Sequence, residues 1–273
     1  MLSVNFNPGG NFMTERCSSM TRYQSLGKGG KRVILPSLLA CDFANLERDI
    51  RELERAGVEG LHLDIMDGHF VPNLSFGIPV VEAVRRTTDL VLDVHLMLSA
   101  PESYFEAFRK AGADGITFHL EAMADLESPG RNFARRGCLR ADADQLSGLR
   151  SRTETALEKI HSLGCACGLS IIPPTDAELL EPYLPLCDNV LIMSVMPGFG
   201  GQKFDPCAKE KLKWVRTHSS PDMLLSVDGG VNETTLADCR DSGASGLVMG
   251  TAVFCGSSID EQFGKLNREL QAF

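Results

Sequence analysis

The 273-residue chain has few aromatic residues, no long apolar run and no excess of positive charge. Aromatic side chains make up 7% of the residues and hydrophobic residues 43%, which is typical of a protein with an aliphatic core. No apolar stretch approaches the roughly 20 residues that a membrane-spanning helix needs. The net charge of −9 argues against a nucleic-acid partner, because phosphates are held by basic side chains. We therefore expect a soluble globular protein that binds neither nucleic acid nor a membrane.

The cysteines lack the spacing of a zinc or disulfide framework. The nine cysteines are scattered, and no two of them form a Cys-x-x-Cys pair. Zinc ribbons and disulfide scaffolds both need regularly spaced pairs. The pattern predicts free thiols in a reducing compartment, and hence a cytoplasmic protein.

The first 32 residues also lack hydrophobic periodicity. They contain five basic residues and a single acidic one, Glu15, and no apolar core of a secretory signal. We expect a disordered N-terminal extension over residues 1–32. A basic, acid-poor leader is also typical of an organellar transit peptide, and Met13 or Met20 could equally be the true start.

From Val33 onward, short apolar runs alternate regularly with helical patterns. The helical pattern FANLERDIRELERAG, for example, ends in a glycine, as helices commonly do. Eight such units predict a single closed (β/α)8 TIM barrel over residues 33–273. Strands are expected at 33–40, 59–66, 90–98, 115–120, 165–172, 189–195, 223–230 and 245–253.

An interruption of this alternation lies at about residues 123–152, in the loop after the fourth strand. It is rich in Arg, Asp, Gly and Ser. Loops that follow strands lie on the active-site face of such barrels, so this insertion could form a lid or an assembly contact. A tolerated surface excursion is the alternative, and we expect the fold to form without it.

The second expected strand carries two kinds of side chain in alternation. In LHLDIMDGHFVPN, which begins at residue 61, Leu61 and Leu63 face one way while His62, Asp64 and Met66 face the other. Buried polar groups need a hydrogen bond, an ion pair or a metal. His-x-Asp by itself fits a hydrogen-bonded pair as well as a metal site.

Two further strands supply more groups of the same chemistry. The third expected strand carries Asp93, His95 and Met97 on one face, and the seventh ends at Asp228. Asp93 lies deeper, where a hydrogen-bonded core role is expected. Two imidazoles and two carboxylates, from His62, Asp64, His95 and Asp228, can enclose one divalent ion and leave positions open for substrate oxygens.

Glycines cluster after the last three expected strands. Glycine lets backbone N–H groups approach an anion, and phosphate commonly binds to the last loops of such barrels. These positions predict a phosphate site formed by Gly198, Gly200, Gly201, Gly229, Gly230, Gly250 and Thr251.

Five motifs together resemble the ribulose-phosphate 3-epimerase family: PSLLACDFANL, LHLDIMDGHFVPN, DVHLML, MSVMPGFGGQKF and SVDGGV. The resemblance covers about residues 33–265 apart from the insertion, and it implies a (β/α)8 TIM barrel of the ribulose-phosphate-binding type. It implies a metal-dependent epimerase that interconverts D-ribulose 5-phosphate and D-xylulose 5-phosphate at C3 by two-base proton transfer through an enediolate. It also implies a homo-oligomer with a small phosphosugar substrate and one divalent ion, with zinc favoured over iron, manganese or cobalt.

The resemblance also assigns roles to single residues. His62, Asp64, His95 and Asp228 match the metal ligands, with Asp64 and Asp228 as the catalytic acid/base pair. Two positions depart from the family pattern, Met196 and Pro174, and both concern loops. Substrate contacts are implied for Ser37, His95, Gly198, Phe199, Gly200, Gly201, Asp228, Gly229, Gly230, Gly250 and Thr251, and a pocket lining for Met66, Met97 and Met193.

Three other functions remain open at this stage. The same chemistry on a six-carbon ketose 6-phosphate fits the same motifs. A barrel that binds phosphosugars without chemistry would not need the acid/base pair. A decarboxylase or aldolase on a related barrel should have a lysine at a strand end, and none of the expected strands ends in lysine.

Overall fold

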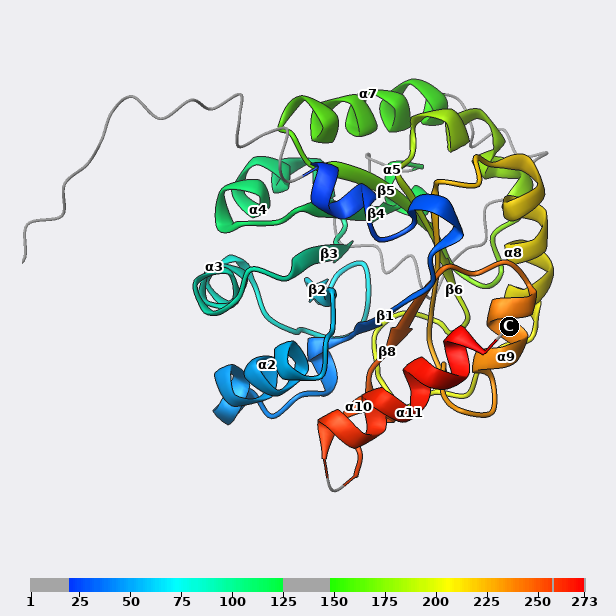
Figure 1. Cartoon of the computed structure of the whole chain (residues 1–273). Helices are drawn as coiled ribbons and strands as arrows, with labels where there is room; N and C mark the ends of the chain where they lie inside the picture. The colour runs from blue at the N-terminus through cyan, green and yellow to red at the C-terminus, as the bar shows by residue number, and fades with distance from the viewer. Residues whose placement is uncertain (1–19, 125–147, 257, 273) are drawn as a thin grey trace, which may run out of the picture.

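The computed structural model describes residues 20–124, 148–256 and 258–272. These residues form a barrel of eight parallel strands surrounded by helices (Figure 1). Each strand pairs with its neighbour in the order β1-β8-β7-β6-β5-β4-β3-β2, and a single bridge between Ser37 and His62 links β1 to β2. The predicted fold class, a (β/α)8 barrel, is confirmed.

All eight strands lie at the predicted places and are mostly a residue or more shorter at their ends. They are β1 (Val33–Pro36), β2 (Gly60–Met66), β3 (Val91–Met97), β4 (Gly115–His119), β5 (Ala166–Ile171), β6 (Asn189–Met193), β7 (Leu224–Asp228) and β8 (Gly246–Met249).

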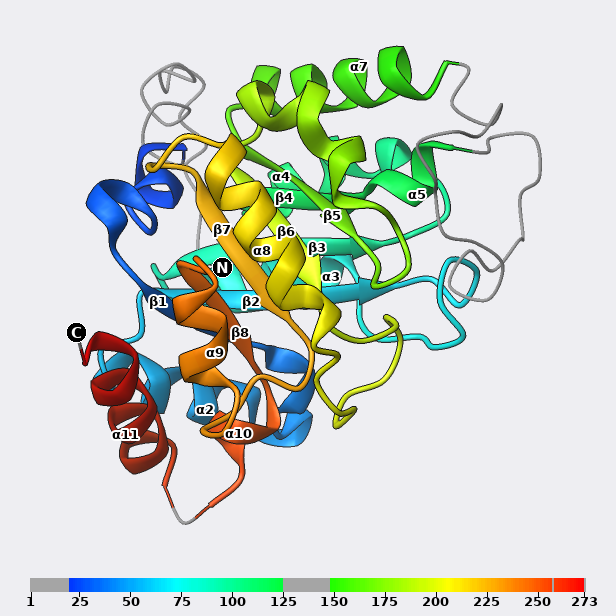
Figure 2. The same ribbon diagram turned by 90° about the vertical axis from the view of Figure 1, so that its right-hand side faces the viewer.

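The helices of the described residues cover the outside of the barrel (Figure 2). The element after β5 is a 3-10 helix rather than an α-helix, because Pro182 and Pro185 lack the N–H groups that α-helical hydrogen bonds require. The α-helices are α2 (Leu46–Arg55), α3 (Ile78–Thr87), α4 (Phe105–Ala111), α5 (Leu120–Met123), α7 (Leu149–Ser162), α8 (Cys207–His218), α9 (Leu236–Asp241), α10 (Thr251–Phe254) and α11 (Ile259–Gln271), and the 3-10 helices are η1 (Lys28–Gly30), η2 (Leu38–Ala40), η3 (Phe43–Asn45), η4 (Pro101–Ser103) and η6 (Ala177–Leu186).

Strand alternation divides the buried side chains into two cores. Leu61, Leu63 and Ile65 of β2 point outward and join the apolar layer between the strands and the helices. Leu35 and Leu191 belong to a separate cluster inside the barrel. Polar side chains such as those of His62, Asp93 and Asn189 are also fully buried there, and the inside of the barrel is therefore where the chemistry has to be sought.

Two boundaries expected from the sequence are wrong. Residues 20–32 are not disordered: residues 20–24 are helical, and Tyr23 and Leu26 are buried against the barrel. Residues 149–152 are the first turn of α7 rather than the end of an insertion, with Leu149 buried. Residues 1–19, and residues 125–147 of the expected insertion, lie outside the described residues, so the insertion itself stays a prediction.

Two expectations drawn from absences can be compared with the described residues. No helix among them is long and apolar enough to cross a membrane. The seven cysteines that fall within them are all free thiols.

Candidate active site

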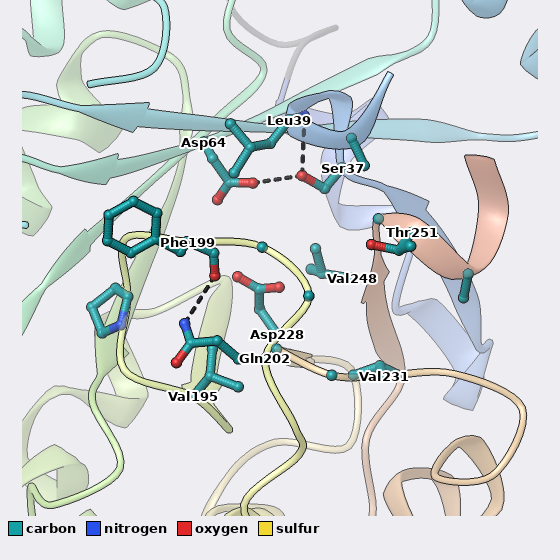
Figure 3. A pocket seen from close by; sticks show the side chains of 18 of the residues that line it. Ser37, Leu39, Asp64, Val195, Phe199, Gln202, Asp228, Val231, Val248 and Thr251 are labelled. Atoms are coloured by element: carbon teal, nitrogen blue, oxygen red, sulfur yellow. Dashed lines mark hydrogen bonds between the residues drawn. The ribbon is translucent and has the colours of Figure 1, made fainter. Parts of the chain in front are cut away.

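The C-terminal ends of the strands surround a cavity of about 690 Å³. Asp64 of β2 and Asp228 of β7 point into it from opposite sides (Figure 3). Ser37 follows β1 and donates a hydrogen bond from Oγ to Asp64 Oδ2 at 2.6 Å, which fixes the orientation of that carboxylate. Of the described residues that line the cavity, Asp64 and Asp228 are the only carboxylates.

Four side chains below the cavity bring their ligand atoms together. One such atom from each of His62, Asp64, His95 and Asp228 lies within 4.8 Å of all the others. Asp64 is central, because its Oδ1 is 3.3 Å from His62 Nε2 and 3.1 Å from His95 Nδ1. Both imidazoles are completely buried, behind the cavity wall that Asp64 forms.

The environment of His62 leaves one nitrogen without a partner. Its Nδ1 is 2.7 Å from Asp93 Oδ2, and since a carboxylate accepts hydrogen bonds, Nδ1 carries the proton. Among the described residues Nε2 makes no hydrogen bond, although it is buried, and the acceptor it faces, Asp64 Oδ1, is 3.3 Å away. A buried polar nitrogen of this kind is costly unless something binds it. A divalent cation bound between His62, Asp64, His95 and Asp228 would use this nitrogen, so the residues fit such an ion.

His95 is supported by a second chain of buried groups. Its Nε2 is 2.9 Å from His119 Nε2, and His119 Nδ1 is 3.3 Å from Glu121 Oε2. Glu121 Oε1 in turn accepts a hydrogen bond from the Ile172 backbone N–H at 2.9 Å. His119 and Glu121 therefore orient His95, and its Nδ1 is left facing the cluster. Supporting partners of this kind fix the ring orientation of metal-binding histidines.

The two cavity carboxylates differ sharply in their affinity for a proton. Burial and, to a smaller extent, the nearby charge of Asp64 together raise the pKa of Asp228 to about 7, while His62 acts in the opposite direction. Burial would also raise the pKa of Asp64, but two contacts outweigh it and hold that pKa well below its usual range: the charge that His62 carries in the metal-free chain, where Nε2 is also protonated, and the hydrogen bond from His95. Two carboxyl groups with pKa values pushed apart are typical of an acid/base pair.

Glycine-rich loops form the other wall of the cavity. The loop after β6 includes Gly198 and Gly201, which have φ of 133° and 74°, a region that favours glycine. One side chain from a distant part of the chain and one from the loop itself hold it in place. Asn73 Nδ2 donates to the Gly198 carbonyl at 2.6 Å, and Gln202 Nε2 donates to the Met196 and Phe199 carbonyls at 2.7 and 2.8 Å.

The structure brings nearly all of the predicted site residues to one place. His62 and His95 lie behind the wall, and all the others line the cavity. Asp93, expected in a hydrogen-bonded core role, contacts His62 as described. Sequence reasoning missed several lining residues with no distinctive chemistry: Leu39, Ala40, Val195, Pro197, Gln202, Val231, Asn232, Val248, Ala252, Phe254 and Cys255. Gln202 lies within a quoted motif, MSVMPGFGGQKF, which could have identified it.

A second trio with metal-ligand chemistry lies near the opposite ends of the strands. It consists of His161, Cys167 and Asp188. Its atoms satisfy one another: His161 Nε2 is 2.7 Å from Asp188 Oδ2, and Cys167 Sγ donates to the Leu186 carbonyl at 2.9 Å. Among the described residues, no buried nitrogen or oxygen of this trio lacks a hydrogen-bond partner, unlike His62 Nε2.

Comparison with known proteins points to one family. The sequence model of the Ribulose-phosphate 3 epimerase family matches residues 33–140 and 149–254. The ribulose-phosphate 3-epimerase of Bacillus subtilis is 39% identical over 225 residues, covering 81% of this chain and 91% of the relative. The cytoplasmic isoform of ribulose-phosphate 3-epimerase from rice, Oryza sativa subsp. japonica, is 36% identical over 242 residues, covering 87% and 94%.

Solved structures that resemble this one support the fold alone. A mutant tryptophan synthase alpha-subunit from Pyrococcus furiosus superimposes with a TM-score of 0.59, covering 89% of this chain and 99% of that one. Its sequence identity is 16%, which is too low to carry a function across.

Proposed function

Because the chain belongs to the ribulose-phosphate 3-epimerase family of isomerases, we propose that it interconverts D-ribulose 5-phosphate and D-xylulose 5-phosphate by inverting C3. The observation that carries the proposal is the pair of carboxylates, Asp64 and Asp228, that face each other across the cavity.

Inversion next to a ketone requires a proton to leave one face of the carbon and another to arrive on the opposite face. One carboxylate removes the C3 proton and leaves a planar enediolate, and the carboxylic acid on the other side then supplies a proton to the opposite face. The separated pKa values of Asp64 and Asp228 support this division, since one group is ionised while the other can hold a proton near neutral pH. The reverse reaction exchanges the two roles.

The remaining cavity residues bind and protect the substrate. Ser37 keeps Asp64 aimed at the cavity. Met66, Met97 and Met193 line it with apolar side chains that offer no competing proton donor. The glycines after β6, β7 and β8 allow backbone N–H groups to reach the substrate phosphate.

His62, Asp64, His95 and Asp228 would hold one divalent ion. As a Lewis acid it would stabilise the negative charge that develops on the substrate oxygens, by roughly several kcal/mol. The convergence of these four side chains and the partnerless His62 Nε2 support its presence. Zinc as the metal, a homo-oligomeric state and a cytoplasmic location stay predictions.

The test is to follow inversion at C3 and exchange of the C3 proton with solvent in one experiment on the purified chain. D-Ribulose 5-phosphate in deuterated buffer should give D-xylulose 5-phosphate carrying deuterium at C3, detected by proton NMR, and metal analysis should find one divalent ion per chain. Faster turnover of the six-carbon ketose 6-phosphate would reassign the substrate. Binding of either sugar phosphate with neither inversion nor deuterium exchange would reduce the protein to a binding barrel.

A further inference from the structure

Residues 20–26 close the end of the barrel opposite the cavity. Tyr23 and Leu26 are each only 1% exposed, and both belong to the apolar cluster inside the barrel. The same cluster includes Met193 and Val248, which line the cavity at the other end. In Figure 2 this segment is drawn in blue at the left, away from the loops that follow β2 and β6.

Polar contacts fix the segment in one position. Arg22 Nη2 donates to Asp114 Oδ1 at 2.7 Å, and Gln24 Nε2 donates to Asp188 Oδ1 at 2.9 Å. The tyrosine ring occupies space that strand β4 leaves open with a glycine: a Cβ on Gly115 would lie 2.1 Å from Tyr23 Cε2. The ring position is therefore defined both by its anchors and by the strand beside it.

The Tyr23 hydroxyl reaches the metal-ligand cluster through one intermediate residue. It donates to Asp93 Oδ1 at 2.7 Å, while Asp93 Oδ2 is 2.7 Å from His62 Nδ1. Both oxygens of this fully buried carboxylate are thus occupied, one by Tyr23 and one by His62. The other nitrogen of His62 is the partnerless Nε2 that faces Asp64.

We propose that Tyr23 is a positioning residue of the metal site, which holds Asp93 so that His62 presents Nε2 to a divalent cation. The proposal rests on the proposed function, since it takes the cluster of His62, Asp64, His95 and Asp228 to be a metal site. The family match begins at residue 33, so Tyr23 lies in a part of the chain that the match does not cover.

The physical argument concerns the freedom of a buried carboxylate. In Tyr23→Phe the ring still fills its space, but Asp93 Oδ1 loses its donor inside the barrel, where an unpaired carboxylate oxygen is costly. Asp93 then gains by rotating toward other donors, and His62 loses its fixed orientation. Loss of such a supporting partner typically lowers metal affinity by about 10–100-fold.

The experiment measures metal affinity directly in the full chain. Protein stripped with a chelator is titrated with Co²⁺, and the visible absorption of the bound ion gives both affinity and ligand geometry. Tyr23→Phe should raise the Co²⁺ Kd by about 10-fold or more and change the absorption bands. Tyr183→Phe is the matched control, because Tyr183 is also buried, at 3% exposure, but belongs to η6 on the outside of the barrel.

A double-mutant cycle separates positioning from packing. If Tyr23 acts through Asp93, its substitution should change the Co²⁺ Kd less than 2-fold in an Asp93→Ala background, because the side chain that links Tyr23 to His62 is already absent. Equal effects of Tyr23→Phe in both backgrounds would overturn the proposal, as would a Kd and spectrum that match those of Tyr183→Phe. In either case an intact chain that binds Co²⁺ and epimerises its substrate would leave the proposed function standing. An intact chain that bound no Co²⁺ would overturn this proposal, and the proposed function would fall with it only if the chain also failed to invert D-ribulose 5-phosphate.

Discussion

Replacing Asp228 by asparagine should stop inversion while leaving proton exchange in one of the two epimers. Asparagine keeps the size of the side chain and one oxygen, but it cannot take up a proton. Asp64 remains in place across the cavity, with its Oδ2 held by Ser37 at 2.6 Å. No third carboxylate lines the described part of the cavity, so no other base of this kind can compensate. Epimerisation should fall by about 10²–10⁴-fold, the usual contribution of general acid–base catalysis.

The assay incubates each epimer separately with the variant in deuterated water and follows the C3 proton by NMR. The epimer whose C3 proton faces Asp64 should exchange that proton for deuterium without inverting. The other epimer depends on Asp228 as its base and should show no exchange. Asp64→Asn should give the mirror-image pattern, provided that metal analysis shows each variant to hold its ion.

Asp67→Asn is the control for a general disturbance of the site. Asp67 follows β2 and accepts hydrogen bonds from the Ser99 and His69 backbone N–H groups, each at 2.8 Å, but does not line the cavity. If Asp67→Asn lowers the activity, it should slow proton exchange in both epimers to the same extent. Equal exchange of both epimers in Asp228→Asn or Asp64→Asn would mean that one mobile base serves both faces, and the assigned roles would be wrong.

Three further predictions concern the phosphate site, the expected insertion and pH. In steady-state kinetics, Gly198→Val should raise KM roughly 10-fold, which corresponds to the loss of one hydrogen bond to a charged group. Gly57→Val is the control, because Gly57 also has a positive φ but a Cβ there would meet no atom within 4 Å, and it should leave KM unchanged. Replacing residues 125–147 by a short linker should preserve a single cooperative thermal transition, since Arg152 Nε already ties α7 to the Met123 carbonyl at 2.9 Å; an insoluble product would contradict this. Burial raises the pKa of Asp228 from 3.8 to about 7, so stability from this group is present at low pH and lost as pH rises through that range. In chelator-stripped protein, Asp228→Asn should therefore raise the free energy of unfolding at about pH 8 but leave it unchanged near pH 4, measured by urea denaturation.

The local pattern of the sequence was enough to predict which face of each strand carries chemistry. Side chains alternate along a strand, so the spacing of His62 and Asp64 puts both on the face opposite Leu61 and Leu63, and the structure has them there. Strand ends meet at one end of a (β/α)8 barrel, so Asp228 could be placed beside them once eight units had been counted. The alternation along each strand and the number of strand–helix units are both visible in short stretches of sequence, and together they predict that His62, Asp64 and Asp228 converge.

The support of these groups could not be read from the sequence, because it depends on contacts between distant residues. Tyr23 belongs to a segment without periodicity that was expected to be disordered, yet it contacts Asp93, 70 residues away. Asn73 holds the carbonyl of Gly198 across 125 residues. Such partners are specified by the geometry of the closed barrel. Nothing in the sequence near Tyr23 indicates its contact, and although Asn73 ends the motif LHLDIMDGHFVPN, that motif does not reveal which carbonyl it binds.

The sequence by itself determined the barrel, the inward face of β2 and β3 and the identity of the two cavity aspartates. Tertiary structure alone decided how these aspartates differ. Asp64 lies against two imidazoles, which keep its pKa low, whereas the half-buried Asp228 has lost much of its hydration and lies near the charge of Asp64, which together keep its pKa high. Residue type fixes the ordinary pKa of an aspartate, but burial and neighbouring charges fix the actual one, and these exist only once the strands have closed around the site.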